Sequence, residues 1–318
     1  MIAPGRPDLS VVVVTPDDFR SIARVVGHLR GQTVHDRIEL LIVAPSAAKL
    51  GAAIEAVGAG FQSARVIEHA PVRSRGVAGA AGARAARAAV VAFAENHSFP
   101  DPEWAESFLE AHRGPWAVVG PSVRNANPET QTSRVNFALT YGGWSEPAAA
   151  GEVDLLPFHG SAYKREWLAP YGDRLGPLLD QEYWLQRDVR ERGGRLYFEP
   201  RARTAHLNES VLVTSLRLLF GHGRLFGAGR SSAWSPLRRA GYVLGSPAIP
   251  LLNLPGALRN SARQMGAVGL AASLPSVGLH VAARAAGEAF GYLCGRAGDS
   301  DFLHAHEFSH RSLPASAS

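Results

Sequence analysis

The sequence contains little cysteine and little lysine, and each shortage narrows what the protein can be. Its single cysteine, Cys294, excludes a disulfide bond within the chain and fits a reducing compartment. Lys49 and Lys164 are the only lysines, so arginine carries almost all of the positive charge. The formal net charge is +5, from 33 basic and 28 acidic residues. That balance suits phosphate ligands or an anionic membrane surface, but it is too small to indicate nucleic acid binding.

The first residues, MIAPGRPD, lack the basic start and apolar stretch of a secretory signal. We therefore expect a cytoplasmic protein. A chain of 318 residues is long enough for one large domain or two modest ones.

Strand and helix patterns alternate in the first 120 residues. Apolar, β-branched runs predict strands at residues 10–14, 38–43, 64–68, 90–93 and 116–119. Apolar residues at helical spacing predict helices at residues 19–29, 47–57, 77–88 and 104–111. This alternation predicts a parallel sheet with helices on both faces, which binds ligands at the carboxyl ends of its strands. Farther on we expect a helix near residues 182–192 and strands near Leu155, Leu196 and Thr204.

Beyond residue 230 the sequence changes character. Residues 265–283 have no charged side chain, and this stretch approaches the length of about 20 apolar residues that crosses a bilayer. Its many small and polar residues, with Pro275 and His280, keep it weakly hydrophobic. Four arginines flank the apolar stretches, which favours helices that lie on an anionic leaflet: Arg238, Arg239, Arg259 and Arg263. An ordinary helical subdomain is the alternative, and we expect domains at 1–230 and 231–318.

Four motifs, in order along the chain, carry a family resemblance. They read LSVVVVTPDDFR, AGAAGARAARAAVVAFAENH, LLDQEYWLQRDVRERGG and EPRARTAHL. Their order and spacing resemble the inverting family 2 glycosyltransferases of GT-A fold, over about residues 9–230. The resemblance implies a Rossmann-like mixed sheet flanked by helices, followed by an appended C-terminal helical region that is membrane-associated or packed on the core.

The resemblance also assigns positions to individual residues. It places Thr15 and Pro16 at the turn after the first strand, Gly82 in the helix before the acidic strand tip, and Ala80 where the family has asparagine. Glu95 and His97 stand where the family has the two aspartates of Asp-x-Asp. His206 is at a place where related enzymes offer a further metal ligand. Ala44, Pro45 and Ser46 replace the aspartates that hold the nucleotide base, which leaves the base open.

The leaving diphosphate of a nucleotide-sugar needs its developing negative charge offset, and a divalent metal does this. Glu95, His97 and His206 combine one carboxylate with two imidazoles, a set that favours Mn over Mg. Asn96 is placed to hydrogen-bond a phosphate. The alternative is that Glu95 and His97 only cap the following turn.

Removal of the acceptor proton needs a general base, and the resemblance puts Glu182 at the catalytic carboxylate. Its alternative is a surface helix carboxylate paired with Gln186 or Arg187, and Asp180 is the nearest competitor for the role.

A polar turn in the run LPFHGSAYKREW supplies further candidates for donor binding. His159, Gly160 and Ser161 are suited to approach the transferred sugar, because glycine lets the backbone come close and short polar side chains bond hydroxyls. Tyr163 and Lys164 are expected in the first turn of the next helix. Arg224 and Arg75 are candidates to pair with the diphosphate.

Together these features predict a metal-assisted, inverting glycosyltransferase with a nucleotide-sugar donor and a saccharide or lipid-linked acceptor. Residues 231–295 are expected to contact the inner face of the membrane peripherally. Two other classes stay open: a non-catalytic protein of this fold that binds a sugar nucleotide or a partner, and a metal-dependent hydrolase.

Overall fold

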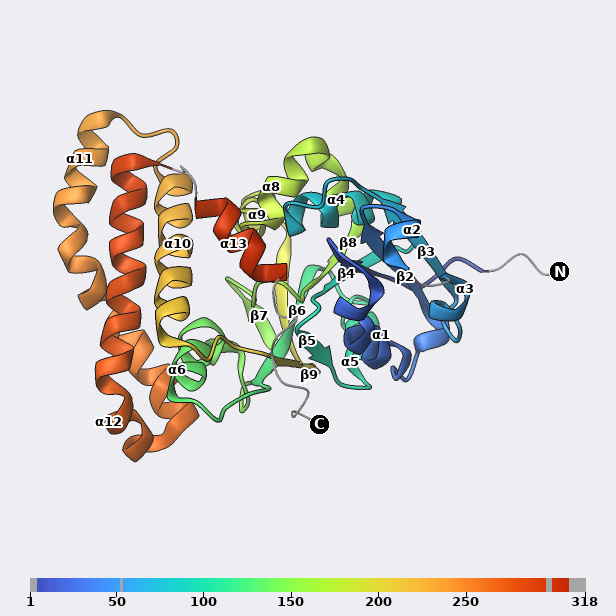
Figure 1. Ribbon diagram of the computed structural model, residues 1–318, viewed down its shortest axis with the longest axis horizontal. Coiled ribbons are helices and arrows are strands. Elements are labelled where there is room, and N and C mark those ends of the chain that lie inside the picture. The colour runs from blue at the N-terminus through green and yellow to red at the C-terminus, as the bar shows by residue number, and fades with distance from the viewer. Residues whose placement is uncertain (1–4, 52–53, 296–298, 309–318) are drawn as a thin grey trace. The chain divides into compact units, whose positions relative to one another are not determined.

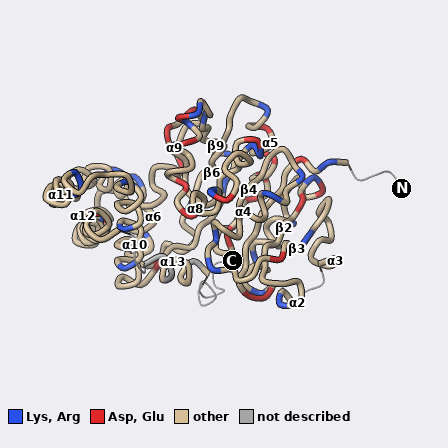
Figure 2. Tube along the Cα trace, turned by 90° about the horizontal axis from the view of Figure 1, so that it is seen from above, with Lys and Arg blue, Asp and Glu red and all other residues tan. Residues whose placement is uncertain are grey.

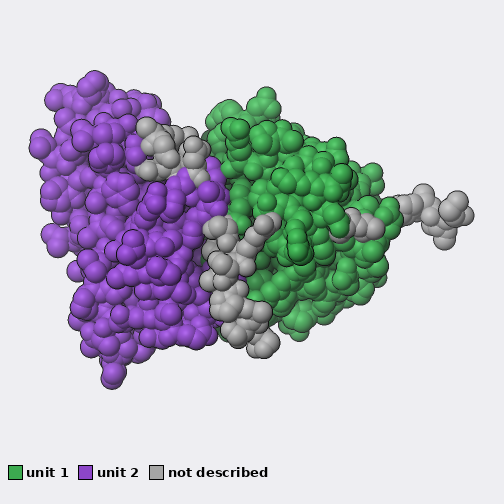
Figure 3. All heavy atoms as spheres, viewed as in Figure 1, with its two compact units in different colours: residues 1–124, 144–206, 307–314 green, residues 125–143, 207–306, 315–318 purple. Residues whose placement is uncertain are grey.

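A computed structural model describes residues 5–51, 54–295 and 299–308. By contacts between Cα atoms the chain divides into two compact units, coloured separately in Figure 3. The first unit contains residues 1–124, 144–206 and 307–314, and the second contains residues 125–143, 207–306 and 315–318. The boundary of domains at residue 230 stays a prediction.

The first unit is built on one mixed sheet, which has nine strands within the described residues. Their spatial order is β3-β2-β1-β4-β8-β6-β9-β5, with β7 paired to β9 (Figure 1). The strands are β1 (Leu9–Val14), β2 (Ile38–Ala44), β3 (Ser63–Glu68), β4 (Val90–Ala94), β5 (Ser98–Pro100), β6 (Trp116–Asn125), β7 (Gly151–Val153), β8 (Ala162–Lys164) and β9 (Arg195–His206).

The direction of the strands changes across this sheet. β1, β2, β3 and β4 are parallel, whereas β8 runs antiparallel to both β4 and β6, and β5 and β7 run antiparallel to β9. The wholly parallel sheet predicted from strand and helix alternation is therefore wrong beyond β4. The mixed sheet that the family resemblance implies is confirmed. Because β1, β2 and β4 are parallel and in register, their carboxyl ends meet at one edge.

Two hydrophobic cores cover the two faces of the sheet, because successive strand residues point to opposite sides. Leu9, Val11 and Val13 of β1 pack in the core that contains α1 (Ala23–Arg30) and α5 (Trp104–Ala111). Val12 and Val14 pack in the other core, with α4 (Arg75–Ala85), α8 (Leu175–Leu179) and α9 (Glu182–Glu191). These cores explain why the β1 run is apolar on both faces.

Several predicted elements have other bounds or other structures. The helix predicted at 47–57 begins as α2 (Ala47–Leu50), which ends at Gly51 in a left-handed conformation (φ 65°), and α3 (Ile54–Val57) is separate. Tyr163 and Lys164 lie in β8 and not in a helix; the helical turn α7 (Arg165–Leu168) begins one residue later. Leu196 and Thr204 belong to one long strand, β9. Short 3-10 helices complete the chain at Phe19–Ser21, His35–Arg37, Gly142–Trp144, Ala169–Arg174 and Ser246–Ala248.

The second unit is helical within the described residues, with α6 (Gln131–Thr140), α10 (Leu212–Arg230), α11 (Pro236–Gly245), α12 (Ile249–Cys294) and α13 (Asp299–Phe308), whose last two residues belong to the first unit. Glycines let α10 and α12 approach backbone to backbone: a Cβ on Gly287 would lie 1.9 Å from the Phe220 carbonyl oxygen. Gly266, at φ 68° and ψ 179°, interrupts the helical geometry of α12. By length and composition alone, the helical stretch Pro236–Cys294 is apolar enough to cross a membrane, and 22% of its most apolar 18-residue window is buried.

Candidate active site

Three potential metal ligands meet at the edge of the sheet where β4 ends. Glu95 follows β4, His97 precedes β5, and His206 is the last residue of β9, which pairs with β5 in register Ser98↔His206. Strand pairing therefore brings His206 next to His97 although they are far apart in the sequence. The three residues are nearly buried, at 3%, 4% and 9% exposure for Glu95, His97 and His206.

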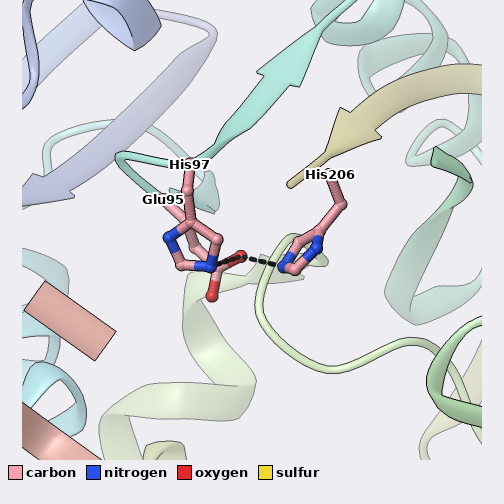
Figure 4. Close-up of side chains that lie close together, drawn as sticks. All are labelled: Glu95, His97 and His206. Carbon is pink, nitrogen blue, oxygen red and sulfur yellow. Dashed lines mark ion pairs between the residues drawn. The ribbon is translucent and has the colours of Figure 1, made fainter. Parts of the chain in front are cut away.

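The side chains point toward one another (Figure 4). The Nε2 atoms of His97 and His206 lie 3.9 and 3.7 Å from the same Glu95 oxygen, Oε2. One ligand atom from each residue fits within a span of 4.8 Å. Metal–nitrogen and metal–oxygen bonds are about 2.1 Å long, so two ligands of one ion lie at most about 4 Å apart. The arrangement therefore fits a divalent metal ion bound by one carboxylate and two imidazoles after only a small closure.

Asn96 orients one of these imidazoles. Its Oδ1 lies 2.7 Å from His97 Nδ1. An amide oxygen only accepts, so His97 Nδ1 carries the proton and donates, which leaves Nε2 with a lone pair on the side of Glu95. Histidines that bind metals are commonly fixed in this way by a partner on the other ring nitrogen. The structure thus gives Asn96 a contact that sequence reasoning missed, and its contact with a phosphate stays a prediction.

Positive charge lies next to the cluster at the start of α4. Arg75 Nη1 is 3.7 Å from Glu95 Oε1, and the Arg75 side chain is 12% exposed. Asp180 fixes this helix end, because its carboxylate accepts hydrogen bonds from Ser74 Oγ (2.6 Å) and Gly76 N (2.8 Å). A side chain on Gly76 would collide with the backbone of Asp180, since a Cβ there would lie 2.4 Å from the backbone nitrogen of Asp180. Arg75 is therefore held beside the predicted ligands by an acidic residue just before α9.

Glu182, the predicted base, is the first residue of α9 and is 2% exposed. The Tyr163 hydroxyl donates to Oε2 over 3.2 Å, and His159 Nδ1 lies 3.4 Å from Oε1. Burial, together with the Glu182 charge, raises the pKa of Tyr163 well above its ordinary value, so this hydroxyl remains a donor. These contacts hold the carboxylate inside the unit and differ from the surface pairing with Gln186 or Arg187.

The loop at residues 159–160 lies beside Glu182 and lines a cavity that Glu95 also lines. His159 contacts Glu182, while Gly160 and Glu95 line the same small cavity of about 10 Å³. His159 has a left-handed backbone (φ 62°), which is uncommon for a residue with a side chain; strained conformations of this kind cluster at functional sites. The loop thus lies next to Glu182 and lines one cavity with Glu95, and a shared catalytic role of the two carboxylates stays a prediction.

Other predicted donor-binding residues lie at the same sheet edge or under it. Thr15 and Pro16 follow β1; Thr15 is fully buried, and its Oγ1 accepts from Asp17 N over 3.1 Å. Ser161 is also fully buried, and its hydroxyl donates to the Pro157 carbonyl. Their roles toward a donor stay predictions.

Two candidates have clear packing contacts. Gly82 of α4 faces the sheet, and a Cβ there would lie 2.5 Å from Val12 Cγ1, so close helix packing already requires this glycine. Arg224 belongs to the second unit, where its Nε donates to the Gly295 carbonyl and its guanidinium lies over the Phe290 ring. Neither contact tests binding of a diphosphate.

Residues 10–171 match the sequence profile of Glycosyl transferase family 2. The match covers more than half of the chain and includes Arg75, Glu95, His97 and His159. The chain belongs to this glycosyltransferase family. Glu182 and His206 lie beyond the matched residues, so their place in the site rests on the fold.

Solved structures of glycosyltransferases resemble the family 2 chain. A mannosyltransferase from Pyrobaculum calidifontis, in complex with GDP-Man and Mn2+, has a TM-score of 0.57 and 16% identity, covering 90% of this chain and 88% of that chain. GalNAc-T7 with UDP, GalNAc and Mn2+ has a TM-score of 0.49 and 13% identity, covering 73% of this chain and 52% of that one. At 16% identity the likeness to the mannosyltransferase shows the GT-A fold alone. No curated protein matches the sequence.

Proposed function

We propose that this glycosyltransferase moves a sugar from a nucleotide-diphosphate donor to an acceptor hydroxyl, with inversion at the anomeric carbon and with the help of a divalent metal. One observation carries the proposal: Glu95, His97 and His206 converge at the end of β4, and the loop at residues 159–160 links this cluster to the buried Glu182.

Glu95, His97 and His206 would hold the metal. When bound, it supplies positive charge to the leaving diphosphate. The imidazole nitrogens favour Mn over Mg, because Mg prefers oxygen ligands. Arg75 adds a fixed cation beside the same cluster, so the residues of this chain offer both metal ligands and a guanidinium at the place where charge develops. The Mn2+ in the complex from P. calidifontis supports this assignment.

Glu182 removes the proton from the acceptor hydroxyl as that oxygen attacks the sugar. Tyr163 donates to Oε2 and thereby fixes the plane of the carboxylate, which leaves Oε1, on the side of His159, to meet the acceptor. The His159 side chain is 20% exposed while that of Glu182 is 1% exposed, so the acceptor reaches the base past His159. Direct attack by the acceptor, with one base and no covalent intermediate, inverts the anomeric configuration.

The donor is a nucleotide-sugar, as the GDP-Man complex of the similar mannosyltransferase suggests. The acceptor is a saccharide or a lipid-linked saccharide, and the protein acts in the cytoplasm at the inner face of a membrane. His159, Gly160 and Ser161 are positioned to contact the transferred sugar, and Thr15 and Pro16 to contact the nucleotide.

A panel of nucleotide-sugars tests this function on the full-length protein. A donor that binds the native state raises the melting temperature, and the rise should require Mn. With that donor and a panel of saccharide and lipid-linked acceptors, NMR of the product gives the anomeric configuration. Inverted product supports the proposal; retained configuration, or turnover that survives chelation unchanged, contradicts it.

Glu182→Gln tests the base separately from the metal. It keeps the size and one oxygen acceptor for Tyr163, so the fold and donor affinity should be unchanged. The kcat should fall by about 10²- to 10⁴-fold, the usual contribution of a general base. Glu191→Gln is the matched control, because Glu191 lies on the same helix with its side chain 59% exposed. Near wild-type kcat in Glu182→Gln would exclude Glu182 as the base.

A further inference from the structure

Helix α11 and the first turns of α12 present leucines to solvent. Leu237 and Leu244 of α11 are 85% and 82% exposed, and Leu251 and Leu252 of α12 are 71% and 78% exposed. Helix α11 has no buried residue. We call these four leucines the α11 surface. Exposed leucines at this density differ from the scattered apolar residues of an ordinary soluble surface and indicate a partner.

Basic residues outnumber acidic residues around the α11 surface. Between Glu209 and Glu288 the sequence contains no Asp or Glu, whereas Arg238 and Arg239 lie on α11 and Arg259 and Arg263 on α12. In Figure 2 the coils labelled α11 and α12 carry blue basic positions and are otherwise tan. The partner of the α11 surface must therefore offer both an apolar medium and negative charge.

A cavity beside the α11 surface has the same dual character. It has a volume of about 530 Å³, and its lining includes Tyr242, Leu252, Arg230 and Arg238. Glu288 also lines it, with its Oε1 3.6 Å from Arg230 Nη1. The Arg238 guanidinium stacks 4.3 Å from the ring centre of Trp234, and within the described residues no hydrogen bond or ion pair engages that guanidinium. Trp, Tyr and Arg beside exposed leucines are the residues that anchor proteins at the boundary between lipid headgroups and acyl chains.

Two other occupants fit less well. A second copy of this chain, docked through the same surface, would bring the arginines of both copies together without acidic residues to offset them. A membrane-spanning arrangement conflicts with the packing of α12 inside its own unit. His280 is fully buried there and bonds Ser215, and Val277 packs with Val135 of α6. A bilayer surface satisfies the leucines without undoing these contacts.

We propose that the α11 surface binds an anionic phospholipid bilayer, with its leucines in the acyl boundary and Arg238 and Arg239 at the headgroup phosphates. Each arginine near an anionic leaflet adds to the free energy of binding, and the apolar side chains add affinity as they leave water. The proposal rests on the membrane location in the proposed function and identifies the surface responsible; the interaction concerns the second unit alone and does not depend on sugar transfer.

Sedimentation of the full-length protein with lipid vesicles tests the proposal. Binding should be strong on phosphatidylcholine vesicles that also contain phosphatidylglycerol and weak on phosphatidylcholine alone. Salt at about 1 M, where the Debye length is about 3 Å, should release most of the protein. Equal binding to both vesicle types, or binding to neither, would overturn the proposal.

Two double variants locate the surface. Arg238→Gln with Arg239→Gln should weaken binding to anionic vesicles about 30-fold, since each basic residue contributes about a fivefold factor near the surface. Leu244→Gln with Leu251→Gln should weaken it at least tenfold, because each buried leucine contributes more than that in full transfer. Arg20→Gln, at a residue with a side chain 91% exposed in the first unit, is the control and should bind like the wild type.

Circular dichroism establishes that each variant is folded, and donor binding by thermal shift should equal that of the wild type. That second readout separates this proposal from the proposed function, because donor binding can fail while vesicle binding holds, and the reverse. Vesicle binding as strong as that of the wild type in both folded double variants would contradict binding through the α11 surface. Resistance of the bound wild type to alkaline carbonate would instead indicate a spanning helix, and a dimer lost in the leucine variant would indicate a second copy; either overturns the proposal.

Discussion

Asn96 gives the sharpest test of the metal site, because its contact with the site is a single hydrogen bond to a proposed ligand. In Asn96→Ala the His97 ring loses the acceptor that lies 2.7 Å from Nδ1. The imidazole then has no fixed tautomer and less restraint on its orientation. We expect weaker Mn binding in the absence of any nucleotide, so a contact between Asn96 and phosphate plays no part in the result.

The size of the effect follows from the geometry. Removal of such a partner usually lowers metal affinity 10- to 100-fold, or about 1.4–2.7 kcal/mol. The His97 ring is nearly buried and also packs edge-on against His206, with ring centres 4.7 Å apart, which limits its freedom. We therefore expect about 10-fold, at the lower end. One neutral hydrogen bond contributes only about 1 kcal/mol to folding, so the melting temperature should fall by a few degrees at most.

Titration calorimetry with Mn measures the affinity directly. Asn96→Asp keeps the acceptor and adds negative charge, so it should match or exceed the wild type. Asn253→Ala, at an exposed position of α12, is the matched control and should not change the affinity. Wild-type affinity in Asn96→Ala, or an equal loss in Asn253→Ala, would refute the reasoning.

Three further predictions concern stability and the fixed helix end. Burial lowers the pKa of His112 from 6.5 to about 4, so the wild type should lose up to about 3 kcal/mol of unfolding free energy as the pH falls from about 6.5 to 4. Chemical denaturation at a series of pH values should show a smaller loss in His112→Gln. An equal dependence of unfolding free energy on pH in the two proteins would contradict the role of His112. Gly287→Ala should destabilise the protein by about 1–3 kcal/mol, because the new Cβ would meet the Phe220 carbonyl. Gly278→Ala, with no atom within 4 Å of its Cβ, should be neutral or stabilising. Equal melting temperatures of the two variants would contradict this. Asp180→Asn loses an acceptor for Ser74 or Gly76 and should raise the donor KM by loosening Arg75, an effect that Asp173→Asn at an exposed position should lack.

The sequence predicts the central strands of the fold well. The β-branched runs at β1, β2 and β4 are apolar on both faces, and only a strand with a core on each side explains that pattern. The sequence places Tyr163 wrongly in a helix, because a strand of three residues such as β8 is too short to show the alternation of apolar and polar residues. The antiparallel direction of β8 depends on tertiary pairing with β4 and β6, which no local pattern records.

The candidate site, like the fold, could be predicted only in part from the sequence. The family resemblance names Glu95, His97, His206 and Glu182; the structure brings the first three side chains together, and the role of Glu182 stays a prediction. The supporting contacts were not predictable, since Tyr163 and Asp180 act across 19 and 106 residues of sequence, on Glu182 and on Ser74. No local pattern in the sequence links residues so far apart, so these contacts become visible only in the folded structure.

Anomalous X-ray scattering from crystals soaked with Mn and a nucleoside diphosphate shows directly which side chains bind the metal. We expect one Mn peak about 2.2 Å from a Glu95 carboxylate oxygen and from the Nε2 atoms of His97 and His206, with the diphosphate on its open side. A Mn peak bound to other side chains, or a bound diphosphate with no Mn at these three residues, would contradict it.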